Sequence, residues 1–254
     1  MKYFPKSASQ VCIKEIINQT NNSFYKIYKE DGKTEIGTGF FCNIKYEKKN
    51  IPVIIINDLG IYEEDLYTII IYKNNTKEEI KLGETKIKNK EFNIVVIEII
   101  DNKSSEIHFM EIDDRIYQKD IELLFNNESL YIMQYSNIDN IQISPGVMSN
   151  ILNNSEFEYL GNKDSIGSLI FNVSNNKIIG ILYKNKSIYI DTGFFFQSVI
   201  IKFIIKYKHN KYHENEINIL IKVEQEDINN KIYFLDNYGL GNKDSVVHNN
   251  KKRR

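Results

Sequence analysis

Cysteine and histidine are the residue types in this chain best suited to nucleophilic, acid–base or metal-binding chemistry. The sequence has two cysteines and four histidines, at Cys12, Cys42, His108, His209, His213 and His248. A cysteine nucleophile needs a neighbouring base, whereas both cysteines lie in short apolar runs of strand character near the N-terminus. This placement predicts buried, reduced thiols that pack in a core rather than a cysteine peptidase site.

The histidines include one pair with a spacing that suits metal binding. His209 and His213 are four residues apart, which on a helix would place both side chains on one face. No glutamate follows His209 in the zinc-peptidase pattern, and no cysteine is near. We therefore expect no metal and no cofactor, and we interpret each histidine as a solvated surface imidazole.

Composition disfavours several classes of protein. The chain has 254 residues, 42% hydrophobic and 26% charged, which is typical of one folded β-rich domain or two small units. The net charge of −1 provides no basic excess to neutralise a phosphate backbone, so a dedicated nucleic-acid binder is disfavoured. The first residues have no apolar signal-like core, and no run of about 18 apolar residues occurs. We therefore expect a cytoplasmic or otherwise intracellular protein that does not enter a membrane.

Short apolar runs with the two-residue period of β-strands recur along the chain. They cover residues 13–16, 24–28, 39–44, 53–56, 67–72, 80–82, 94–99, 130–135, 141–143, 168–172 and 178–183. β-Branched and aromatic residues dominate these runs, as suits half-buried pleated surfaces. The pattern predicts an all-β protein of barrels or sandwiches. A single stretch, residues 198–206, fits a short helix or a strand equally well.

Polar segments divide the chain into three parts, with a first boundary near residues 113–128. The first part spans residues 1–112 and the second spans residues 113–208. Residues 209–254 contain two further strand-like runs and a basic end, Lys-Lys-Arg-Arg. We interpret this last part as an appended strand pair with a solvated tail.

Four segments, in this order, resemble the chymotrypsin-fold (trypsin-like) serine peptidases. Residues 37–41 read Gly-Thr-Gly-Phe-Phe, similar to the family's Gly-x-Gly-Phe strand. Residues 53–61 are similar to its Leu-Ile-Thr-Asn-Asn-His-Val-Ile strand and turn, and residues 91–99 to its Asp-Ile-Ala-Ile-Ile-Glu-Ile segment. Residues 164–171 resemble Gly-Asn-Ser-Gly-Ser-Pro-Val-Phe, and residues 178–181 resemble the Val-Ile-Gly-Ile strand that follows it.

This resemblance covers about residues 10–207 and implies a particular architecture. The family has two packed six-stranded antiparallel β-barrels, with the active cleft between them. Its histidine and aspartate come from the first barrel and its serine from the second. Residues 191–196, Asp-Thr-Gly-Phe-Phe-Phe, lie near where the family builds its specificity pocket. Their three aromatic side chains fit a barrel core better than a pocket wall.

The chain departs from the family at every member of the catalytic triad. Leu59 stands at the histidine position, Asn93 at the aspartate position and Ile166 at the serine position. Leucine cannot take a proton, isoleucine has no nucleophilic atom, and asparagine has no charge to stabilise an imidazolium. Asp164 stands at the glycine of the oxyanion hole, where it would put a carboxylate beside developing negative charge. These departures predict a catalytically inactive homologue.

Three interpretations of the function remain open. The first is an inactive homologue that binds a peptide or protein partner in or near the former cleft, because strand-like peptide binding does not need the triad. The second is an active or weakly active serine endopeptidase in which the register shifts by one residue, Ser165 is the nucleophile and His108 is a candidate base. The third is a drifting or truncated paralogue without a retained role, suggested by the appended strand pair. The sequence leaves the ligand and the oligomeric state undetermined.

Overall fold

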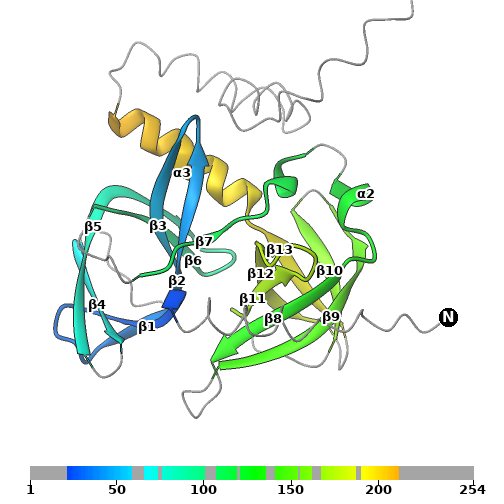
Figure 1. Cartoon of the computed structure of the whole chain (residues 1–254), viewed down its shortest axis with the longest axis horizontal. Coiled ribbons are helices and arrows are strands. Elements are labelled where there is room, and N and C mark those ends of the chain that lie inside the picture. The colour runs from blue at the N-terminus through cyan, green and yellow to red at the C-terminus, as the bar shows by residue number, and fades with distance from the viewer. Residues whose placement is uncertain are drawn as a thin grey trace, which may run out of the picture.

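Two β-barrels packed side by side make up the described part of the chain (Figure 1). The computed structural model describes residues 22–58, 66–73, 76–100, 107–118, 121–135, 141–153, 155–161, 167–186 and 190–211. The runs predicted at residues 13–16 and after residue 211 lie outside these ranges, as do Cys12, His213 and His248.

The first barrel is formed by six antiparallel strands. They are β1 (Phe24–Tyr28), β2 (Glu35–Tyr46), β3 (Lys49–Asp58), β4 (Thr68–Lys73), β5 (Thr76–Asn89) and β6 (Ile94–Ile99). Their order is β1-β4-β5-β6-β3-β2, and the pairing of β1 with β2 closes the ring. A short strand, β7 (Met110–Glu111), adds to the outer edge of β2 in parallel. Ile54, Ile56 and Val95 belong to the apolar cluster of this barrel.

The second barrel is also closed by six strands. They are β8 (Ser129–Tyr135), β9 (Ile141–Ile151), β10 (Glu156–Gly161), β11 (Leu169–Asn172), β12 (Ile178–Asn185) and β13 (Ile190–Phe195). Their order is β10-β13-β12-β11-β8-β9. The predicted fold class, two packed six-stranded antiparallel barrels, is therefore confirmed.

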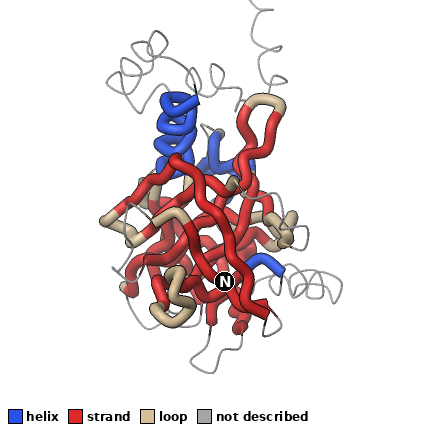
Figure 2. Tube along the Cα trace, turned by 90° about the vertical axis from the view of Figure 1, so that its left-hand side faces the viewer, coloured by secondary structure: helices blue, strands red, loops and turns tan. Residues whose placement is uncertain are grey.

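The named helices occupy the connection between the barrels and the end of the described chain, and residues 22–23 are also helical. The connection contains a 3-10 turn, η1 (Asp114–Tyr117), and a short helix, α2 (Ile121–Phe125). The stretch that fitted a helix or a strand is helical, within α3 (Gln197–Lys211). Figure 2 shows that strands dominate the body and that this longest helix stands at one end of it.

Helix α3 starts directly after the second barrel and packs against the first. The Lys206 ammonium donates to the carbonyl of Lys86 at 2.9 Å. The Asn210 amide donates to the Thr85 hydroxyl at 3.2 Å. Near the end of the helix, Lys211 pairs with the buried Glu98 carboxylate at 3.4 Å. The helix that follows the second barrel thus binds to β5 and β6 of the first barrel.

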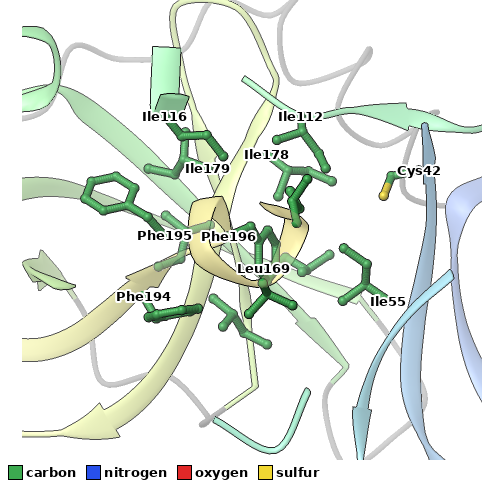
Figure 3. Close-up of a cluster of buried hydrophobic side chains, with 14 of the residues drawn as sticks. Cys42, Ile55, Ile112, Ile116, Leu169, Ile178, Ile179, Phe194, Phe195 and Phe196 are labelled. Atoms are coloured by element: carbon green, nitrogen blue, oxygen red, sulfur yellow. The ribbon is translucent and has the colours of Figure 1, made fainter. Parts of the chain in front are cut away.

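One apolar cluster continues from the first barrel into the second. Figure 3 shows Cys42 and Ile55, from the first barrel, on the opposite side of this cluster from Phe194 and Phe195 of β13. Phe194, Phe195 and Phe196 are at most 1% exposed, as expected of core aromatics. Cys42 is a free, fully buried thiol whose pKa is raised by desolvation, so its predicted role in packing is confirmed.

Candidate functional site

Most residues of the site predicted from the family resemblance fall outside the described chain. Leu59, Asp164, Ser165 and Ile166 are all in undescribed ranges. Asn93 is described, as is Gly167, which follows residue 166 in the chain. The assignment of the triad positions therefore stays a prediction. The geometry described below is that of the described residues next to these positions in the chain.

Asn57 and Gly167 bring the two halves of this site into contact. Asn57 is near the end of β3, and Gly167 precedes β11 of the other barrel. A Cβ atom added to Gly167 would lie 1.6 Å from the Asn57 Nδ2 atom, so the carboxamide packs directly on the glycine backbone. Gly167 also has a φ of +92°, which only glycine adopts without strain. The structure therefore brings the end of β3 against the residue that leads into β11.

Beside this contact, β12 extends beyond its pairing with β11. The last bonds between the two segments join the Gly167 N–H to the Leu182 carbonyl at 2.8 Å and the Leu182 N–H to the Ser168 carbonyl at 2.9 Å. Lys184 and Asn185 continue in register with Thr192 and Asp191 of β13. Within the described chain, Lys184 and Asn185 therefore have a strand partner on one side only, and Tyr183 lies at the bulge before them.

The direction of one backbone group on this open edge follows from strand geometry. The Lys186 N–H donates toward β13, to the Ile190 carbonyl at 3.0 Å. Successive residues of a strand point their N–H groups to opposite edges, and the only β-bulge of the β12–β13 pair lies between Leu182 and Lys184. The N–H of Asn185 therefore points away from β13, to the edge that has no strand partner among the described residues.

Tyr183 lies directly before the open edge and is held by groups from both barrels. Its hydroxyl donates to the Glu156 carboxylate of β10. Partial burial, together with the bond to Glu156 and the charge of that group, raises the pKa of Tyr183 above its ordinary value. The phenol therefore stays protonated near neutral pH, as its donor role requires.

Phe92 of the first barrel reaches the same tyrosine. Its ring stacks on Phe194 with centroids 3.7 Å apart and meets Tyr183 edge-on with centroids 4.8 Å apart. Asn93, the next residue, is exposed and has a φ of +52°. The described residue at the predicted aspartate position thus carries an uncharged amide in a turn.

The described histidines lie away from the junction of β3 and β11. His108 is exposed, and its N–H donates to the Asn22 carbonyl at 3.0 Å. It precedes β7, and the strand order β3-β2-β7 places β2 between this segment and the strand that carries Asn57. His209 is exposed in the last turn of α3.

The described residues also lack two other features. No helix there is long and apolar enough to cross a membrane. No group of three or more histidine, cysteine, aspartate or glutamate side chains gathers there as metal ligands would.

Sequence reasoning missed three residues that the structure brings to this site. Asn57, Phe92 and Tyr183 each act through a contact between segments far apart in the chain, so local patterns did not single them out. Weak signals were present. Phe92 is a large apolar residue directly before a strand, and Tyr183 is the last aromatic residue of a strand run.

Several solved structures similar to this chain are serine proteases. A serine endoprotease from Yersinia pestis matches with a TM-score of 0.51 and 14% identity, covering 80% of this chain and 68% of that one. An M. tuberculosis protease in its inactive form matches with a TM-score of 0.49 and 10% identity, covering 78% and 94%. A human astrovirus serine protease matches with a TM-score of 0.43 and 13% identity, covering 69% and 90%. No family model and no curated protein matches the chain.

The similarity to the Y. pestis endoprotease and the strand topology of this chain both support the same fold. The described chain has the chymotrypsin-like double barrel found in trypsin-like serine proteases.

Proposed function

We propose that this chain is a catalytically inactive homologue of the trypsin-like serine peptidases that binds an extended peptide segment of a partner protein along the open edge of β12. The observation that carries the proposal is this edge at residues 184–185, next to the contact between Asn57 and Gly167. An added strand gains affinity from main-chain hydrogen bonds, for which the Asn185 N–H is positioned. Binding of this kind needs no nucleophile and no base.

The loss of catalysis follows from the residues assigned to the triad. Ile166 offers no nucleophile, and Leu59 offers no base. Replacing the aspartate by asparagine alone costs about 10⁴ in rate in an otherwise intact triad. Asp164 would further oppose an oxyanion. The alternative site with Ser165 needs a base, and β2 lies between the segment of His108 and the strand that carries Asn57.

The peptide-binding part of this proposal is tested with a random peptide library displayed on phage and selected against the full chain. Selected peptides are then measured against two variants of one residue. Asn185→Pro removes the N–H of the open edge, whereas Asn185→Ala keeps it. We expect Asn185→Pro to weaken binding at least about tenfold, since one lost bond and a steric block each cost about 1 kcal/mol or more.

Asn185→Ala should bind nearly as the wild type does. Peptides that bind the proline variant unchanged would contradict binding at this edge. A library that yields no peptide enriched over the proline variant would contradict it as well.

A further inference from the structure

The turn between β5 and β6 carries a side chain from the first barrel into the second. This side chain, Phe92, is 9% exposed although it belongs to a surface turn. Its ring lies nearly parallel to Phe194, at an interplanar angle of 21°, and nearly perpendicular to Tyr183, at 86°. Aromatic pairs with this geometry contribute attraction beyond the burial of apolar area.

Two asparagines give the turn the shape that this insertion needs. The Asn89 side-chain oxygen accepts the N–H of Glu91 at 3.0 Å and the N–H of Phe92 at 3.3 Å. Asn93 closes the turn with a φ of +52°, in the left-handed region where asparagine is one of the few tolerated side chains. The residue at the family's aspartate position thus shapes the backbone that carries Phe92.

Tyr183, the target of Phe92, is held from a second direction. Its hydroxyl donates to Glu156, and Glu156 also accepts the Asn153 amide at 2.5 Å. Glu156 lies opposite Phe194 in the pairing of β10 with β13. The residue directly before the open β12 edge is therefore fixed between the first barrel and β10.

We propose that residues 89–93 form a clasp, in which Phe92 holds Tyr183 and so keeps the open edge of β12 extended and ready for an added strand. This inference rests on the proposed function for its purpose, since it names what positions the binding edge. Its physical content is separate. The clasp predicts local protection of the β12 backbone with or without a ligand.

The chain offers a matched control in a second aromatic contact between the barrels. Phe40 of β2 is 2% exposed and packs on Phe196 with ring centroids 5.7 Å apart. The N–H of Phe196 donates to the carbonyl of Ile179, at the opposite end of β12 from Tyr183. Removing Phe40 therefore removes a buried inter-barrel phenylalanine without touching the open edge.

The test is hydrogen–deuterium exchange of the full chain, without ligand, in Phe92→Ala, Phe92→Leu and Phe40→Ala. We expect Phe92→Ala to speed exchange of the hydrogen-bonded amides of Leu182 and Lys186 at least about tenfold relative to β8 and β9, and Phe40→Ala not to produce this local effect. Phe92→Leu keeps apolar volume but loses the ring stacking on Phe194, so it should show the same local increase in exchange more weakly. If the alanine variant does not fold, the leucine variant tests the clasp in its place.

A second pair of variants tests the turn. Asn93→Gly tolerates the left-handed conformation and should behave as the wild type, whereas Asn93→Val should reproduce the effect of Phe92→Leu. Unchanged exchange at Leu182 and Lys186, or an increase spread equally over both barrels, would overturn the clasp. Local loosening in a protein that selects no peptide would support the clasp and contradict the proposed function.

Discussion

Two regions where the barrels meet contrast in their chemistry: the connection around Asp113 and the candidate site around Asn57 and Gly167. Asp113 is 2% exposed and keeps its charge, because its carboxylate accepts several hydrogen bonds. The Arg115 guanidinium donates to both of its oxygens at 2.7–3.2 Å, and the Asn175 amide donates to it at 2.9 Å. At the candidate site, the contact between the barrels includes an uncharged amide lying on a glycine and the ring of Phe92 stacked on Phe194.

The difference indicates which interactions this chain has kept. A buried carboxylate persists at the connection, where its partners are complete and it fixes the chain between the barrels. The residues predicted at the triad positions carry no group that could change protonation in a hydrolysis. The described residues at the site thus meet through ring packing and an amide on a glycine, whereas the connection is held by a buried ion pair. Variants in each region can break or sharpen this contrast.

The largest expected effect is at the candidate site. Gly167→Ala should lower the free energy of unfolding by about 2–4 kcal/mol, because the new Cβ overlaps Asn57 and the φ of +92° disfavours alanine. The double variant with Asn57→Ala removes the overlap but not the backbone strain, so it should recover roughly half of the loss. Urea unfolding of the two single variants and the double variant measures this. A Gly167→Ala protein as stable as the wild type would refute the close contact.

A smaller effect, with a defined pH dependence, is expected at the connection. Burial opposes the charge of Asp113, but the bonds from Arg115 and Asn175 outweigh it and lower its pKa. Asp113→Asn should therefore cost about 2 kcal/mol at neutral pH. Because a lowered pKa stabilises the fold only while the group is charged, this cost should shrink below about pH 4, as the wild type takes up a proton.

The adjacent Asp114 provides the control for this prediction. It forms a half-exposed pair with Lys45 at 3.0 Å, so Asp114→Asn should cost less than about 1 kcal/mol. Urea unfolding across acidic and neutral pH compares the two variants. A difference between wild type and Asp113→Asn that stays constant on acidification would contradict the role of the paired carboxylate.

Much of the fold followed from the sequence because strand period and β-branched composition are local signals. The runs predicted at residues 24–28 and 94–99 coincide with β1 and β6. The prediction missed β10 and β13. Strand β10 alternates glutamates with aromatic residues, and β13 has Asp-Thr-Gly directly after its first residue. Neither strand therefore contains a strong apolar run.

Helix α3 illustrates tertiary packing deciding between two local options. Its isoleucines and Val199 favour a strand by propensity. The buried residues Val199, Ile200, Phe203 and Ile204 have helical spacing, and the helix buries them together against the barrels. The site was less predictable than the fold because Asn57, Phe92 and Tyr183 acquire their roles only where the two barrels meet.

The central claim, that this trypsin-like fold carries no serine nucleophile, is tested most directly by labelling the purified chain with a fluorophosphonate probe. An active trypsin-like enzyme and the Ser165→Ala variant serve as controls. We expect no labelling of the wild type under conditions in which the active enzyme reacts completely. Labelling of the wild type that disappears in Ser165→Ala would contradict the account and would identify Ser165 as an activated nucleophile.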